Sequence, residues 1–189
     1  MEMDDENIFF LDESGFSLST RRDKGWSYKG SKANVVVPAI RSRNISTVAA
    51  ISKSGLLYFE TKYAAYNAAS FDKFLTNFFQ FLVTKGINRA VIIMDNVSFH
   101  KTQAIQQKIH DSGHLHHYLP PYAPFPDPIE NIFSIWKQSV KTPRVNSTDE
   151  LEHRIRLAAE RITAKHISSC FRNMKKYLVK CRDQEEIEN

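Results

Sequence analysis

Three acidic residues stand where predicted secondary-structure elements end or begin, and they are the strongest chemical signal in the sequence. Asp12 follows the apolar run 8–11, Asp95 follows the apolar run 91–94, and Glu130 opens an amphipathic segment. Carboxylate oxygens are the ligands that Mg²⁺ and Mn²⁺ prefer, and clustered carboxylates repel one another unless a cation lies between them. The three acids therefore predict a site for divalent metal, and two such ions about 4 Å apart catalyse phosphodiester cleavage.

Each of these acids also has a purely structural interpretation. An Asp at the end of a strand commonly starts a turn. The stretch Asp127-Pro128-Ile129-Glu130 matches a helix start, with an N-cap residue, Pro at the first position and Glu at the third. Capping and catalysis are equally supported for Glu130 by spacing alone. Glu13 is adjacent to Asp12, so in a strand it points to the opposite face, and we leave it out of the predicted site.

Polar residues beside these acids are candidates to support the metal ligands without binding the metal. They are Asn96, His100 and Asp127. His100 follows Asp95 by five residues, which is close enough in sequence for it to orient a ligand or a phosphate. A histidine in such a place is more often a packing or surface residue, and the sequence leaves both roles open.

The periodicity of apolar residues predicts the elements that position the acids. It predicts strands over 8–11, 45–51, 56–61, 90–94 and 115–119, and helices over 69–85, 102–112, 129–140, 147–162 and 165–181. A hairpin followed by strand–helix alternation indicates an α/β fold with a mixed central sheet and helices on both faces. Asp12 and Asp95 meet at the carboxyl ends of their strands if those strands are neighbours.

The charge of the chain indicates an anionic partner, with nucleic acid as the first choice. The formal net charge is +5 and the isoelectric point is about 9.2. Basic residues mixed with aromatics occupy the segment 19–45, and a second basic run lies on the last predicted helix. We expect DNA contacts from Arg21, Arg22, Lys24, Lys29, Lys32, Arg41, Arg43, Arg172, Lys175 and Lys176. A solvated loop and a solvated helix face are the alternatives for these two stretches.

Several function classes are disfavoured by the sequence. It contains no P-loop, no GxGxxG and no GxSxG motif, so no small-molecule cofactor is expected. The acidic N-terminus is unlike a signal peptide, and no apolar run approaches the length of a membrane span. We therefore expect a protein that is not secreted and has no membrane partner. It would be nuclear in a eukaryote, and otherwise in the cytoplasm or the nucleoid.

Three blocks of the sequence resemble the catalytic blocks of the DDE-type transposases of the mariner superfamily. The blocks are IFFLDESGF, VIIMDNVSFH and LPPYAPFPDPIEN, and the resemblance covers about residues 8–141. It implies an RNase H-like fold of about five strands with extra C-terminal helices. It also implies that Asp12, Asp95 and Glu130 are a catalytic triad that binds two Mg²⁺ or Mn²⁺ ions. The implied reaction is cleavage and strand transfer at transposon ends and target DNA, by a protein that is a homodimer when full-length.

The sequence departs from the family pattern at two levels. Ala123, Pro126 and Asp127 replace the usual Ser, Leu and Asn of the third block, although the register to Glu130 is kept. The resemblance implies a helix-turn-helix region before the first block, and we expect none in this sequence, where seven residues precede that block. We expect one catalytic domain over 1–189, with a core at about 8–141 and a helical extension at about 147–182. Two alternatives remain: an inactive transposon-derived DNA-binding or scaffold protein, and an RNase H-like nuclease without strand transfer.

Overall fold

A mixed sheet forms the centre of the computed structural model, which describes residues 7–17, 27–32, 44–120, 127–140 and 147–183. In chain order its strands are β1 (Ile8–Phe16), β2 (Ile45–Ser52), β3 (Gly55–Lys62), β4 (Val91–Met94) and β5 (Leu115–Tyr118). The spatial order is β3-β2-β1-β4-β5. The β1–β2 and β2–β3 pairs are antiparallel, whereas β1–β4 and β4–β5 are parallel. The mixed five-stranded sheet predicted from the sequence is confirmed.

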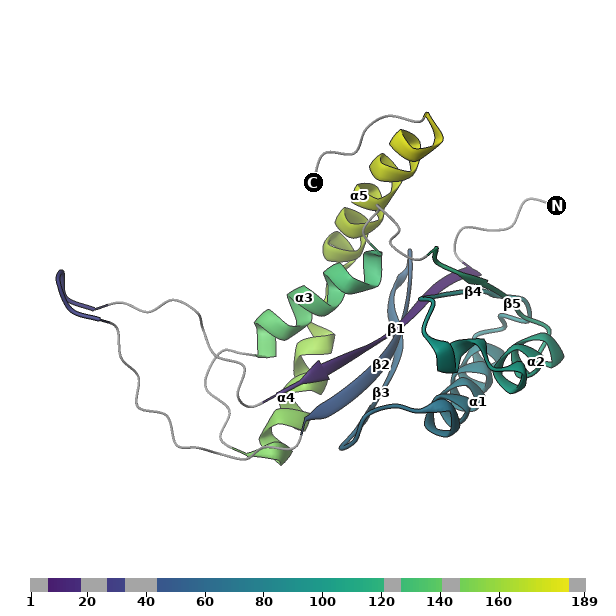
Figure 1. Cartoon of the computed structure of the whole chain (residues 1–189), viewed down its shortest axis with the longest axis horizontal. Helices are drawn as coiled ribbons and strands as arrows, with labels where there is room; N and C mark the ends of the chain where they lie inside the picture. The colour runs from purple at the N-terminus through teal and green to yellow at the C-terminus, as the bar shows by residue number, and fades with distance from the viewer. Residues whose placement is uncertain (1–6, 18–26, 33–43, 121–126, 141–146, 184–189) are drawn as a thin grey trace.

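Helices cover both faces of this sheet (Figure 1). One face carries α1 (Ala68–Thr84), the short 3₁₀ helix η2 (Ser98–Lys101) and α2 (Gln103–Asp111). The other face carries α3 (Pro128–Val140), α4 (Thr148–Glu160) and α5 (Ala164–Arg182). Among the described residues, no helix is both long enough and apolar enough to cross a membrane.

The alternation of side chains along β1 explains why the protein has two hydrophobic layers. Phe9 and Leu11 pack with α1 and α2, whereas Phe10 and Phe16 pack with α3, α4 and α5. Successive residues of a strand point to opposite faces, so a strand with apolar residues at consecutive positions fits only when both faces are covered. The buried run in β1 thus places the next residues, Asp12 and Glu13, on opposite faces as well.

The helix α1 forms as its apolar spacing predicts. Its buried residues recur at helical spacing and fill the layer next to Phe9 and Leu11: Phe71, Phe74, Leu75, Phe78, Phe79 and Leu82. Asn67 caps the first turn by accepting a hydrogen bond from the backbone N–H of Ser70 at 2.9 Å. Gly86 follows the helix with a φ of 72°, a left-handed conformation that glycine adopts without steric cost.

The predicted end of the first strand is wrong. The apolar run 8–11 suggested that β1 stops at Asp12, but the strand continues to Phe16. The reason is its second neighbour, because β1 pairs with β2 from Phe10↔Ile51 through Phe16↔Ile45. Pairing with β4, in contrast, ends at Leu11↔Met94. Asp12 is therefore inside β1 and yet lies at the point where the parallel β1–β4 ladder stops.

Candidate active site

Asp12 and Asp95 lie on neighbouring strands at the same level of the sheet. Leu11 pairs with Met94 as the last pair of the parallel β1–β4 ladder, and the two acids are the next residues in the chain, Asp12 within β1 and Asp95 directly after β4. The condition set by the sequence, that the two strands be adjacent, is met. The sheet thus brings together two carboxylates that are far apart in the chain.

Asp127 and Glu130 approach the same region from the start of α3. The Oδ1 atom of Asp127 accepts a hydrogen bond from the backbone N–H of Ile129 at 3.1 Å, so Asp127 caps the helix. Asp127 is buried, whereas Glu130 in the first turn is exposed. The segment 121–126 that leads into α3 lies outside the described residues. The N-cap role predicted for Asp127 is confirmed, and Glu130 lies exposed in the first turn of the helix that Asp127 caps.

The pKa values of Asp12 and Asp127 show that the four acids of this region repel one another. Burial raises the pKa of Asp12 to about 8, the backbone N–H of Glu13 opposes this rise, and the charges of Glu13, Asp127 and Asp95 add to it. Burial also raises the pKa of Asp127 to about 7, with added repulsion from Glu130 and Asp95. Such carboxyls are charged more easily when a cation is present.

His100 is enclosed behind Asp95, on the α1 side of the sheet. Its side chain is fully buried, and its Nδ1 atom lies 2.8 Å from Oδ1 of Asp95. Its Nε2 atom lies 2.9 Å from Oε1 of Glu13. Burial alone lowers the pKa of His100, but the contacts with Asp95 and Glu13 outweigh it and raise the pKa to about 9. Burial likewise works against ionisation of Asp95, yet the contact with His100 prevails and lowers its pKa.

Glu13 was left out of the predicted site, and the structure shows that it contacts Asp95 indirectly, through His100. The predicted alternation of side chains along the strand is confirmed, because Glu13 points to the face opposite Asp12. It reaches the site nevertheless, since His100 on that face contacts both Glu13 and Asp95. The only sequence signals were its adjacency to Asp12 and the five-residue spacing from Asp95 to His100. Neither spacing reveals that residues 13 and 100 lie together.

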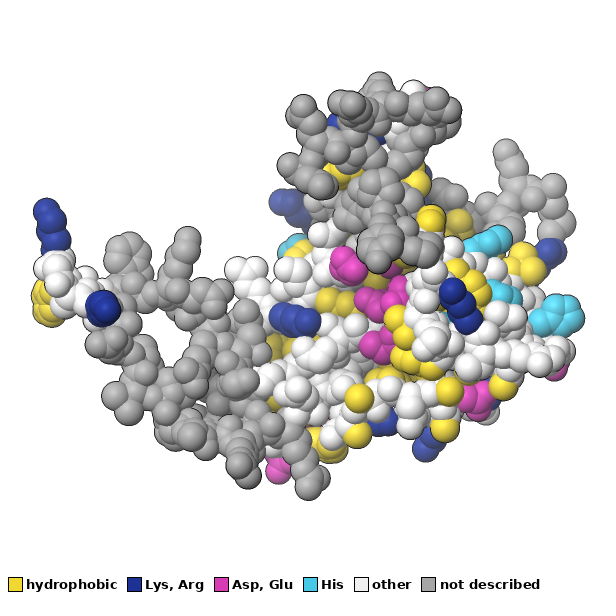
Figure 2. Space-filling model, in the orientation of Figure 1, with side chains coloured by type: hydrophobic (Ala, Val, Ile, Leu, Met, Phe, Trp, Pro, Cys, Tyr) yellow, Lys and Arg dark blue, Asp and Glu magenta, His cyan; other side chains and the backbone are white. Residues whose placement is uncertain are grey.

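The acids supply the oxygen donors that a hard divalent cation prefers, but the described acids do not form a complete coordination shell. In the described part of the chain, no group of three His, Cys, Asp or Glu side chains is arranged to hold a metal ion. The donors are all carboxylates, which suits Mg²⁺ or Mn²⁺ and disfavours softer metals. Figure 2 shows acidic side chains gathered in a strip near the centre of the viewed face, where β1, β4 and α3 meet in Figure 1.

The predicted DNA-contacting residues are only partly covered by the structure. Arg172, Lys175 and Lys176 are exposed on α5, as expected for either a DNA surface or a solvated face. Lys29 and Lys32 are also exposed. The other basic residues of the segment 19–45 lie outside the described residues: Arg21, Arg22, Lys24, Arg41 and Arg43.

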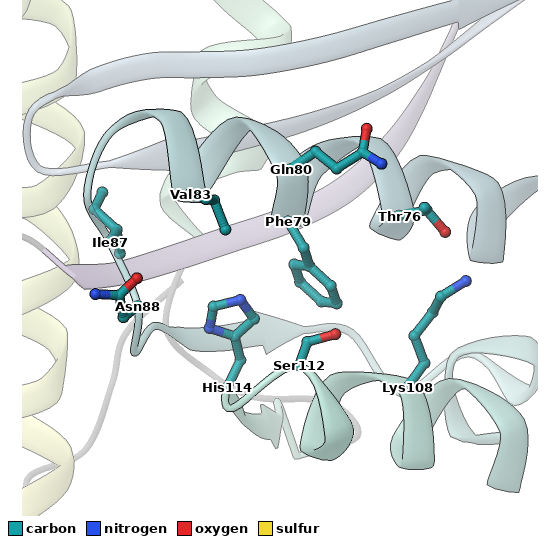
Figure 3. A pocket seen from close by; sticks show the side chains of 9 residues that line it. All are labelled: Thr76, Phe79, Gln80, Val83, Ile87, Asn88, Lys108, Ser112 and His114. Carbon is teal, nitrogen blue, oxygen red and sulfur yellow. The ribbon is translucent and has the colours of Figure 1, made fainter.

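A hollow of about 370 Å³ lies between α1 and α2, away from the acids (Figure 3). Its lining includes Phe79, Val83 and His114, and none of the predicted site residues. Lys108 on its rim is paired with Asp72 at 2.6 Å. The His114 ring accepts a hydrogen bond from the backbone N–H of Ala90. Its two basic side chains, Lys108 and His114, therefore have structural partners, and we place the candidate chemistry at the open carboxylate cluster.

Comparison with protein families gives a match that includes the region of all four acids. The family model described as DDE superfamily endonuclease matches residues 7–152 of the 189-residue chain. The chain belongs to the DDE superfamily of endonucleases. A search of curated proteins found no match.

Solved structures support the same fold for this DDE domain. The Mos1 transposase paired-end complex with left transposon end matches with a TM-score of 0.79 and 17% identity, over 95% of this chain and 55% of that chain. The Mos1 mariner paired-end complex with Mn matches with a TM-score of 0.79 and 18% identity, over 96% of this chain and 57% of that chain. The catalytic domain of Mos1 mariner transposase matches with a TM-score of 0.71 and 16% identity, over 97% of this chain and 85% of that chain.

These matches confirm the RNase H-like fold that the resemblance implied. The DDE chain spans a little more than half the length of the DNA-bound transposase chains. It spans most of the isolated Mos1 catalytic domain. The predicted family, a DDE-type catalytic domain with a mariner-like fold, is confirmed.

Proposed function

We propose that this domain cleaves DNA phosphodiesters with divalent metal and joins the resulting ends, as the catalytic part of a DDE-type transposase. The observation that carries the proposal is the placement of Asp12 and Asp95 directly beyond the Leu11↔Met94 pair. Glu130 adds a third carboxylate from the first turn of α3. The names of the similar structures support it, since they include transposon-end complexes and a complex with Mn.

Asp12, Asp95 and Glu130 are the residues that would hold two Mg²⁺ or Mn²⁺ ions. Bound there, such ions supply Lewis-acid activation of an attacking water or 3′-hydroxyl and stabilisation of the leaving oxygen. The protein itself contributes the fixed spacing of Asp12 and Asp95, since both come directly after the last pair of the β1–β4 ladder. Asp127 contributes by capping α3, which sets the position of the first turn that carries Glu130.

Metal binding tests this proposal most directly. We expect Mn²⁺ binding to the wild type in isothermal titration calorimetry. We expect affinity at least about tenfold weaker in Asp95→Asn and in Glu130→Gln, because each variant removes one charged ligand. Asp111→Asn, a change of an exposed acid on α2, is the matched control and should bind like the wild type. The titration is repeated with a short DNA duplex, whose phosphates can complete the metal shell. Absence of binding under both conditions would contradict the proposal.

DNA binding by α5 forms a second, separate prediction. Charge reversal of Arg172, Lys175 and Lys176 to Glu should weaken binding of a short duplex and reduce the slope of log K against log salt by about 3, roughly one per basic residue. Fluorescence anisotropy at several salt concentrations measures both effects.

The control for the α5 variant carries the same change of charge on the other face of the sheet, the face that α1 covers. Lys73, Lys85 and Arg89 are exposed residues of α1 and of the connection between α1 and β4, and their reversal to Glu gives an equal change in net charge. Equal loss of affinity in the two triple variants would show that only net charge matters and would remove α5 from the interface.

The predicted homodimer stays a prediction.

A further inference from the structure

Both the ring and the backbone of His100 are held in place by contacts with other elements. Its side chain has no exposed surface, and its ring packs against Phe71 and Phe99 at centroid distances of 4.3 and 4.4 Å. Its backbone carbonyl accepts a hydrogen bond from the Tyr118 hydroxyl at 2.8 Å. The backbone and the ring plane are thus fixed by contacts from α1, η2 and β5.

With the ring plane fixed, both ring nitrogens face carboxylates. Nε2 lies 2.9 Å from Oε1 of Glu13, and Nδ1 lies 2.8 Å from Oδ1 of Asp95. The first contact is an aligned hydrogen bond, while the second is a short ion pair without hydrogen-bond alignment. An ionised carboxylate only accepts hydrogen bonds, so Glu13 selects a ring with a proton on Nε2.

The contacts to Asp95 leave it able to bind a ligand. His100 and the backbone N–H of Val97 both approach the same oxygen, Oδ1, at 2.8 and 3.3 Å. The side chain of Asp95 is 39% exposed, although the histidine behind it is fully buried. Asp95 can therefore be held through one oxygen while Oδ2 meets a ligand from the open side of the sheet.

We propose that Glu13 and His100 are positioning residues that fix the orientation of the Asp95 carboxylate from the face opposite Asp12. The inference rests on the proposed function, because Asp95 is there a metal ligand. Groups that orient a metal ligand from behind typically change metal affinity about 10- to 100-fold when they are lost. The chain Glu13–His100–Asp95 runs from β1 through η2 to the end of β4, and so joins both strands that supply the acids.

Substitution of Glu13 tests the proposal with little risk to folding. Its side chain is at one end of the Glu13–His100–Asp95 series of contacts and is 20% exposed, whereas His100 is fully buried. Glu13→Leu removes the hydrogen-bond acceptor, whereas Glu13→Gln keeps an acceptor oxygen at the same reach. We expect Mn²⁺ affinity to fall about 10- to 100-fold in Glu13→Leu and to be largely restored in Glu13→Gln. DNA affinity measured without divalent metal should be unchanged in both variants.

A control variant separates this effect from a general loss of stability. Glu152→Leu removes another carboxylate that joins two elements, since Glu152 on α4 contacts Thr61 of β3 and Arg156. Thermal melts of both Leu variants are recorded, and Mn²⁺ affinity should be unchanged in Glu152→Leu whatever its melting temperature. Equal affinity losses in Glu13→Leu and Glu152→Leu would overturn the positioning role.

NMR of the metal-free protein detects the hydrogen bond between His100 Nε2 and Glu13 directly. In ¹⁵N-histidine NMR spectra, the Nε2 proton of His100 should exchange slowly with solvent in the wild type and in Glu13→Gln, and rapidly in Glu13→Leu. Wild-type Mn²⁺ affinity together with an unaffected Glu13→Leu variant would overturn this inference alone. A wild type that binds no Mn²⁺, with or without duplex, would overturn the proposed function and this inference with it.

Discussion

Asp95→Asn and Asp12→Asn are each expected to lower Mn²⁺-dependent nicking of supercoiled plasmid by at least about a thousandfold. Metal ions supply several kcal/mol of transition-state stabilisation in phosphodiester cleavage, and each 1.36 kcal/mol corresponds to a factor of ten in rate. An amide in place of either carboxylate removes one negative charge from the pair that the β1–β4 ladder aligns. Glu130→Gln should have a comparable effect if it completes the same metal shell.

Two further substitutions make this experiment specific. Asp127→Asn keeps the side-chain oxygen that accepts the hydrogen bond from Ile129, so nicking should fall less than about tenfold. Glu160→Gln changes an exposed acid at the end of α4 and should leave the rate at the wild-type value. Plasmid nicking is followed by gel electrophoresis at several Mn²⁺ concentrations. A wild-type rate in Asp95→Asn would rule out the proposed metal ligands.

Trp136→Ala is expected to lower the free energy of unfolding by about 3–5 kcal/mol, the usual cost of removing a buried aromatic side chain. Trp136 is fully buried on α3, and its ring lies 5.5 Å from that of Phe16 on β1 and 5.0 Å from that of Phe59 on β3. Its Nε1 donates a hydrogen bond to the backbone carbonyl of Ile155 on α4 at 2.8 Å. One side chain thus joins α3 to the sheet and to α4.

Urea unfolding followed by circular dichroism measures this effect, which corresponds to a drop in melting temperature of about 6–20 °C for a chain of this size. Trp136→Phe keeps most of the ring but leaves the Ile155 carbonyl without its donor, so it should cost about 1–3 kcal/mol. Leu157→Ala on the exposed side of α4 should stay within about 0.5 kcal/mol of the wild type. A loss below about 1 kcal/mol in Trp136→Ala would contradict the anchoring role.

The sequence alone was sufficient for the element types and for the elements beside which three acids lie: Asp12 with β1, Asp95 after β4 and Glu130 at the start of α3. Their role as metal ligands stays a prediction. Period-two and helical spacing are local properties, and strands such as β2 and helices such as α1 form where this spacing predicts them. The two acids at the β1–β4 ladder were found because each follows a short apolar run, and Glu130 because it opens an amphipathic helix. These signals survive in the sequence because burial and helix capping act on neighbouring residues.

Only the tertiary structure decided how the acids are supported. The pairing of β1 with β2 carries the first strand past Asp12, and no local pattern encodes partners that lie 29 to 41 residues away, from Phe16↔Ile45 to Phe10↔Ile51. The burial of His100 depends on Phe71 of α1, and its contact with Glu13 joins residues 87 positions apart. Sequence spacing relates residues that are close to one another in the chain, whereas the packing of helices on a sheet brings residues together that are distant in the chain. The places of the acids beside strands and a helix start were therefore predictable, but the Glu13–His100–Asp95 contacts behind them were not.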